Sequence, residues 1–211
     1  MRILWLSHLI PYPPKGGVLQ RAYYLLREVA RHHEVDLIAF NQVALMAPLF
    51  YSVEEGVSEA WKELASFCRN VEFVPIQSER TRYGKYTLAL KSLFTRDPYT
   101  TNWLKSPSFA EKLNEYLESN HYDLVHFDTI SLVPYFGMVS GIPTVLDHHN
   151  IESHMLLRRS GNEKYIVKKW YYRQEGVRLE KVERDLCPRF SLNITCSEID
   201  GQRLKEIAPG S

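Results

Sequence analysis

Two short segments carry the residues whose types and spacing best suit chemistry: the pair Gly16-Gly17 and the run Asp147-His148-His149-Asn150. The glycines stand directly before an apolar pattern with helical spacing. Their backbone N–H groups could therefore approach a phosphate at a helix N-terminus. A flexible turn before the helix is the alternative, because the pair forms neither a GxGxxG fingerprint nor a P-loop.

The two histidines follow an apolar strand, at the place where a substrate would meet the edge of a sheet. An imidazole there can donate or accept a proton, or hydrogen-bond a substrate hydroxyl. A structural role and a metal pair are the other interpretations. Neighbouring side chains on an extended chain point in opposite directions, so His148 and His149 make a poor two-ligand site. We predict no metal site and no cofactor.

Two further stretches combine basic and aromatic residues. The first contains Arg82 and Lys85, and the second contains Lys168 and Lys169 beside Trp170. Such helices can lie on an anionic membrane surface, although a solvated face with aromatic packing beneath it is the plainer interpretation. We therefore treat the four basic residues as candidate contacts for an acceptor or for a membrane.

The composition is that of an ordinary globular protein, with 211 residues, 45% of them hydrophobic, and 26 basic against 25 acidic residues. This balance gives no overall attraction to nucleic acid, so we predict no nucleic-acid partner. The three cysteines are widely spaced and predict neither a disulfide framework nor a zinc site. Without a signal-peptide pattern or a long apolar span, the expected location is the cytoplasm, with peripheral contact to the inner face of the membrane as an option.

Apolar runs alternate with amphipathic helical patterns along the chain, which predicts an α/β fold. We expect a Rossmann-like, doubly wound, mainly parallel sheet with helices on both faces, in one domain over residues 1–211. Ligands bind outside the carboxyl ends of such strands, so segments 7–17, 128–129 and 148–152 are candidate site segments. Strands are predicted at 3–7, 35–40, 71–76, 123–127, 144–147 and 190–196, and helices at about 18–32, 54–67, 80–96, 108–119, 128–140, 163–186 and 198–207.

In their order and spacing these features resemble the N-terminal domain of glycosyltransferase family 4, over nearly the whole chain. The resemblance rests on these parts of the chain: the segment from Pro11 to Gly17, Arg21, Leu25-Leu26, His33-Glu34-Val35, the strand from Tyr122 to His126, the segment from Gly141 to Glu152, and the segment from Phe190 to Glu198. It implies the GT-B fold, in which two Rossmann-like domains face a cleft. This chain would be the acceptor-side half, with the C-terminal donor-binding domain outside it.

The same resemblance implies a function, namely retaining, metal-independent transfer of a sugar from a nucleotide-sugar donor. The acceptor would be a glycan or a lipid-linked molecule, in cell-envelope or exopolysaccharide synthesis. Gly16 and Gly17 would approach the donor diphosphate, and His149 would be the catalytic group near the transferred sugar. Asn150 and Glu152 would contact the substrate. Because the donor-binding half is missing, the fragment alone is expected to be inactive or nearly so.

Two other functions fit the same fold. One is half of a GT-B sugar-nucleotide epimerase, and the other is a non-catalytic module that binds a lipid carrier or a partner protein. A hydrolase is disfavoured, because no serine stands in a GxSxG elbow and no histidine is placed in sequence to activate Cys196.

Overall fold

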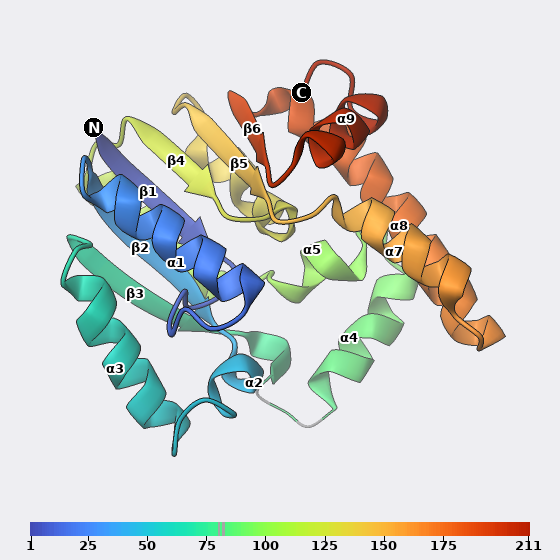
Figure 1. Cartoon of the computed structure of the whole chain (residues 1–211), viewed down its shortest axis with the longest axis horizontal. Helices are drawn as coiled ribbons and strands as arrows, with labels where there is room; N and C mark the ends of the chain where they lie inside the picture. Colours follow the sequence, from blue (N-terminus) through green and yellow to red (C-terminus); the bar gives the residue numbers. More distant parts are fainter. Residues whose placement is uncertain (80, 82) are drawn as a thin grey trace.

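In the computed structural model, which describes residues 1–79, 81 and 83–211, six strands form one all-parallel sheet. Their order is β3-β2-β1-β4-β5-β6, as the ribbon in Figure 1 shows. The α/β, Rossmann-like prediction is confirmed, and the described sheet is parallel throughout. The strands are β1 (Arg2–Ser7), β2 (Glu34–Asn41), β3 (Asn70–Pro75), β4 (Leu124–Phe127), β5 (Thr144–His148) and β6 (Leu192–Thr195).

Helices connect the strands and cover both faces of the sheet. Helix α1 lies in front of the sheet in Figure 1, and α3 contributes side chains to the same core cluster as α1. The α-helices are α1 (Gly17–Ala30), α2 (Val43–Met46), α3 (Val53–Ala65), α4 (Gly84–Leu93), α5 (Tyr99–Trp103), α6 (Pro107–Ser119), α7 (Glu152–Asn162), α8 (Ile166–Leu186) and α9 (Glu198–Ile207). Three 3₁₀ segments complete the described elements: η1 (Gln77–Glu79), η2 (Ile130–Val139) and η3 (Cys187–Arg189).

Alternation along β1 explains why the sheet needs cover on both sides. Ile3 and Trp5 join a core cluster with residues of α1 and α3, whereas Leu4 and Leu6 join a cluster with residues of α6, η2 and α8. All four side chains are buried. A strand that is apolar at successive positions can bury both rows of side chains only between two helical layers.

Serine caps set the start of several helices. Ser106 accepts a hydrogen bond from the backbone N–H of Phe109, with Pro107 in the first turn, and Ser197 accepts one from Asp200. A serine oxygen in this position satisfies one of the N–H groups that a helix leaves without a partner at its start.

Three predicted segments differ from the structure. Residues 152–162, for which no helix was predicted, form α7, which packs along α8 (Figure 1). The stretch after β4 is a 3₁₀ segment that contains Pro134, because proline removes a backbone donor from an α-helix. A helix was expected at 80–96, and the structure has α4 at Gly84–Leu93; Arg80 and Arg82 lie outside the described residues.

Within the described part of the chain, no helix combines the length and the apolar character of a membrane span.

The parallel arrangement of the strands determines where a ligand can bind. The carboxyl ends of β1, β4 and β5 lie at one edge of the sheet, and the chain direction of the crossovers reverses between β1 and β4. In doubly wound folds this switch point is where ligands bind.

Candidate functional site

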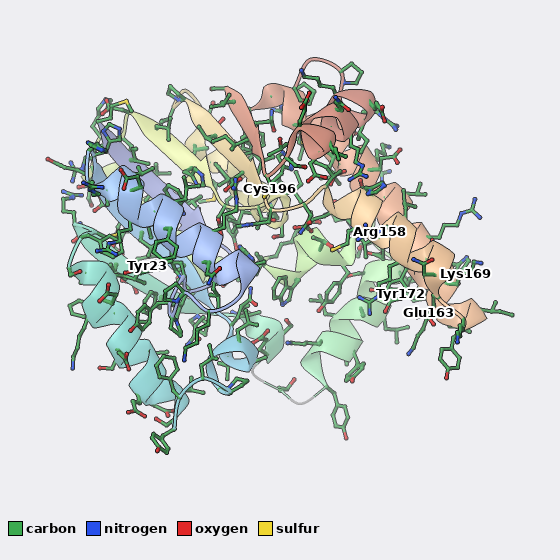
Figure 2. All side chains as sticks on the ribbon, viewed as in Figure 1. Tyr23, Arg158, Glu163, Lys169, Tyr172 and Cys196 are labelled. Atoms are coloured by element: carbon green, nitrogen blue, oxygen red, sulfur yellow. The ribbon has the colours of Figure 1, made fainter. Side chains whose placement is uncertain are left out.

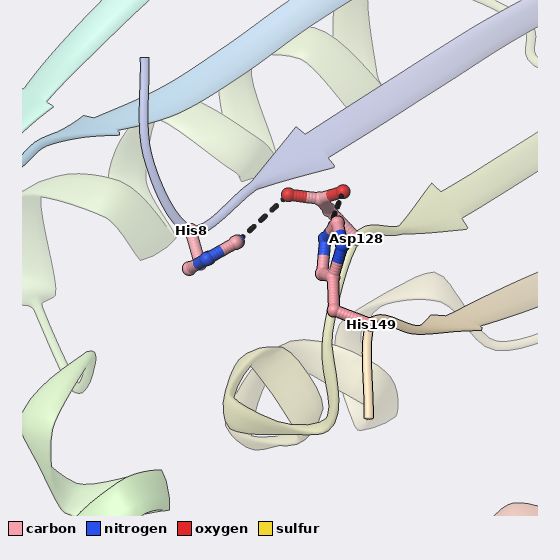
Figure 3. A group of neighbouring side chains, drawn as sticks. All are labelled: His8, Asp128 and His149. Atoms are coloured by element: carbon pink, nitrogen blue, oxygen red, sulfur yellow. Dashed lines mark hydrogen bonds and ion pairs between the residues drawn. The ribbon is translucent and has the colours of Figure 1, made fainter. Parts of the chain in front are cut away.

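A buried aspartate joins two histidines at the switch point. Asp128, directly after β4, has no exposed surface. Its Oδ2 accepts a hydrogen bond from His8 Nδ1 at 2.7 Å and one from Ser7 Oγ at 3.0 Å. Its Oδ1 accepts one from His149 Nε2 at 3.0 Å. Figure 3 shows the carboxylate between the two imidazole rings, which come from the ends of β1 and β5.

The three side chains influence each other's protonation. Burial acts to raise the pKa of Asp128, but hydrogen bonds from His149 and His8 outweigh it and hold this pKa well below its usual range. Burial acts to lower the pKa of His149, but the hydrogen bond and negative charge of Asp128 outweigh that effect and raise this pKa. The aspartate is therefore ionised and favours a protonated imidazole at His149.

A cavity of about 470 Å³ opens beside this group. Gly16 and Gly17 line one part of its wall, and His8, Ser131 and Glu152 line another. A Cβ added to either glycine would meet no atom within 4 Å, so a ligand can approach the backbone there. Gly16 also has a φ of 83°, a backbone conformation that favours glycine. Apolar side chains complete the wall, among them Leu19, Leu45, Trp103 and Met155.

Glu152 enters this cavity from the first turn of α7. Its Oε1 accepts a hydrogen bond from Thr129 Oγ1 at 2.7 Å, and burial raises its pKa. The buried Glu183 of α8 binds the first turn of α7. Glu183 accepts hydrogen bonds from the backbone N–H of Ser153, at 3.1 Å, and from the Ser153 hydroxyl. A carboxyl oxygen at a helix start satisfies N–H groups that have no partner inside the helix.

A second polar group lies beside the first. Arg21 of α1 donates a hydrogen bond from Nη2 to Asp147 Oδ1 at 2.7 Å. Among the described residues, Arg21 Nε, Asp147 Oδ2 and His149 Nδ1 are buried without a hydrogen-bond partner. Buried polar atoms normally have a partner in the protein, in water or in a ligand. The edge of the sheet therefore retains polar groups that can bind a ligand.

The two neighbouring histidines have different surroundings. His148 is buried, its Nε2 lies 3.1 Å from Asn193 Oδ1 on β6, and burial lowers its pKa. His149 faces the other neighbour strand through Asp128. Neighbouring side chains on an extended chain are expected to point in opposite directions. His148 therefore packs toward β6, whereas His149 contacts Asp128 at the site.

The remaining predicted site residues that the structure describes do not line this cavity. Asn150 is exposed, and neither it nor His149 lines the cavity wall. Lys85 Nζ pairs with Glu79 at 2.9 Å, and Arg82 lies outside the described residues. Lys168 and Lys169 belong to α8. Figure 2 shows Lys169 at the outer end of that helix, away from Cys196 at the sheet edge.

His8 and Asp128 are the site residues that the sequence reasoning did not select. Both stand in strand-end segments, and each is among the first polar residues after an apolar strand. That position was the available signal. Their partnership depends on β1 lying next to β4, which no local pattern indicates.

His8, Asp128 and His149 also offer three ligand atoms within 4.8 Å of one another, a set that suits a divalent metal. Two ligands of one tetrahedral zinc ion, each bound at about 2.1 Å, lie roughly 3.4 Å apart. The observed separations of 2.7 Å and 3.0 Å are shorter and match direct hydrogen bonds. The absence of a metal stays a prediction.

Comparison with protein-family models and with curated proteins finds no match for this chain. The sheet order establishes a Rossmann-like α/β domain, and the resemblance to glycosyltransferase family 4 stays a prediction.

Proposed function

We propose that this chain is the acceptor-side half of a retaining, GT-B glycosyltransferase that uses a nucleotide-sugar donor. One observation carries the proposal: the Gly16-Gly17 bend and the linked His8, Asp128 and His149 occupy the same carboxyl edge of a parallel sheet, beside a cavity. This is the edge at which Rossmann-like domains bind ligands. The acceptor would be a glycan or a lipid-linked molecule of the cell envelope or an exopolysaccharide.

The start of α1 suits a diphosphate. No acidic residue stands in its first turn, and no side chain caps it. The first N–H groups of a helix have no partner within it, and they carry the positive end of the helix dipole. Negative charge develops on the diphosphate as the sugar leaves, so donors aimed at it stabilise the transition state more than the ground state.

His149 suits the sugar side of the reaction. In the proposed transfer the acceptor oxygen bonds to the anomeric carbon, the bond from that carbon to the donor phosphate breaks, and the acceptor proton passes to the departing diphosphate. Asp128 keeps His149 oriented and favours its protonated form. Nδ1 of His149 is buried without a hydrogen-bond partner among the described residues, so a sugar or phosphate oxygen bound at this edge would satisfy it.

A second lobe would hold the nucleotide in this mechanism. Closure of two lobes over the cavity would exclude water and favour transfer to the acceptor over hydrolysis. We therefore expect a two-lobed protein to turn over the nucleotide sugar, and this domain by itself to show little or no turnover.

The test is a screen of nucleotide-sugar donors with the natural full-length protein that contains this chain, with product detected by mass spectrometry. Gly17→Val places a side chain in the cavity, and Gly161→Val is its control, since both glycines are helical and face open space. We expect Gly17→Val and His149→Ala each to lower kcat/KM by about tenfold or more, a loss of roughly 1.4 kcal/mol in transition-state binding. Gly161→Val should retain activity.

Retained sugar transfer in both Gly17→Val and His149→Ala would refute the assignment of this site. A change in donor configuration without an acceptor would indicate the epimerase instead. Donor or lipid-carrier binding with no turnover would indicate a binding module.

A further inference from the structure

The turn between α7 and α8 and the first residues of α8 are fully on the surface. Every residue from 164 to 170 is exposed, and this run contains four large apolar or aromatic side chains. Ile166 is 84% exposed, Val167 78%, and Trp170 56%. An isolated surface valine is ordinary, but several such side chains at one tip leave apolar area uncovered. We call this segment, Lys164–Trp170, the hairpin tip.

Positive charge surrounds the hairpin tip. Residues 153–174 contain one acidic residue, Glu163, and six basic residues, a local net charge of +5 in a chain whose total is +1. Within the described part of the chain, Lys164, Lys168 and Lys169 form no ion pair with a carboxylate. Their charge is therefore free to act on a partner. The six are Arg158, Arg159, Lys164, Lys168, Lys169 and Arg173.

The packed pair of helices α7 and α8 supports the hairpin tip. Helices α7 and α8 lie side by side and project beyond the sheet in Figure 1. A Cβ on Gly176 would lie 2.9 Å from Leu157 atoms, which shows how closely the two helices pack. Figure 2 shows Glu163, Lys169 and Tyr172 at the outer end of this pair.

A second exposed apolar stripe lies on the neighbouring helix α4. Tyr86 and Leu90 of α4 and Phe94 at its C-cap stand four residues apart, and all three side chains are exposed. Arg178 of α8 donates a hydrogen bond to the backbone carbonyl of Ser92 at 2.9 Å, so the end of α4 is tied to α8. Two linked helices thus carry uncovered apolar side chains.

We propose that the hairpin tip docks this domain on an anionic lipid bilayer. Ile166, Val167 and Trp170 would enter the headgroup region, while Lys168 and Lys169 would contact anionic headgroups. Tryptophan and tyrosine favour the interface between headgroups and acyl chains, and basic residues beside them add attraction to anionic lipid. A narrow projecting tip suits a deformable surface, whereas a stable protein partner needs about 800 Å² from each side. The proposal does not depend on sugar transfer.

The experiment is co-sedimentation of the chain with vesicles of phosphatidylcholine, with and without phosphatidylglycerol. We expect binding to the anionic vesicles that weakens as salt is added. The double variant Lys168→Glu/Lys169→Glu should lower the partition coefficient by about tenfold or more. Ile166→Ser/Val167→Ser should lower it as well, at every salt concentration. Lys181→Glu, an exposed position farther along α8, is the charge control. Tyr51→Ser, which removes a large exposed side chain away from the hairpin tip, is the control for the serine variant.

Circular dichroism of each variant separates loss of binding from loss of fold. His149→Ala should bind vesicles as the wild type does, so failure of the catalytic proposal leaves this one intact. Absence of binding by the wild-type chain, or equal binding by the wild type and both double variants, would overturn the docking proposal.

Discussion

Replacement of Asp128 by asparagine tests whether the two histidines depend on one buried charge. The variant keeps the shape of the side chain and removes its negative charge. Asp128 accepts hydrogen bonds from Ser7, His8 and His149 in a position with no solvent exposure. Asparagine can keep an acceptor for some of these donors, but its own NH₂ group then faces at least one of the others.

The expected cost follows from this count. Hydrogen bonds to a charged group contribute about 1.5–3 kcal/mol each, and loss of one partner from a buried pair leaves the other without compensation. We therefore expect Asp128→Asn to lower the free energy of unfolding by about 2–4 kcal/mol. Asp97→Asn is the control, because Asp97 pairs with Lys105 at 2.6 Å on the surface and such pairs contribute little.

The penalty should depend on pH, since Asp128 raises the pKa of His149 above its usual 6.5. A histidine whose pKa is higher in the folded protein than in the unfolded chain stabilises the fold at pH below the unfolded-state pKa. This stabilisation is lost as the pH rises through the folded-state pKa. Asp128→Asn should therefore cost more at about pH 5.5 than at about pH 8.5. Urea unfolding at both pH values measures the penalty, and an NMR titration of His149 should show its pKa lowered in the variant. An unchanged His149 titration, or an equal penalty at both pH values, would refute this reasoning.

Two further predictions concern the support of α7. Burial raises the pKa of Glu183 from its ordinary 4.5 to about 7. The wild type should therefore lose on the order of 3 kcal/mol of stability as the pH rises from the pKa of the unfolded chain to the pKa of the folded protein. Glu183→Gln should flatten this slope, and an unchanged pH profile in urea unfolding would contradict the assignment. Gly176→Ala should destabilise the chain by about 1–3 kcal/mol through crowding against Leu157. Gly161→Ala, which meets open space, should stabilise it by about 0.5–1 kcal/mol, and thermal melts that rank the two variants in the opposite order would rule out this account.

Much of the fold could be predicted because its signals are local. The central strands are buried apolar runs, and all six strands were predicted within a few residues of their observed bounds. The caps at Ser106 and Ser197 also depend only on neighbouring residues. Helix α7 was missed because its own sequence mixes polar residues with Gly161, and its position depends on packing against α8.

The site was predicted only in part. Gly16, Gly17 and Glu152 come together at one cavity, and His149 lies beside it through Asp128. The basic residues chosen beside aromatic ones do not join that site. Lys168 and Lys169 are separated from it along α8, which makes the hairpin tip a surface of its own.

The sequence by itself determined the six strands and most of the helices, and therefore which residues stand at strand ends. Only the tertiary structure decided which of those ends are neighbours. His8 and Asp128 are 120 residues apart along the chain, and they meet because β1 pairs with β4. Strand periodicity is a property of each segment, whereas the order of strands in a sheet depends on the packing of the whole chain.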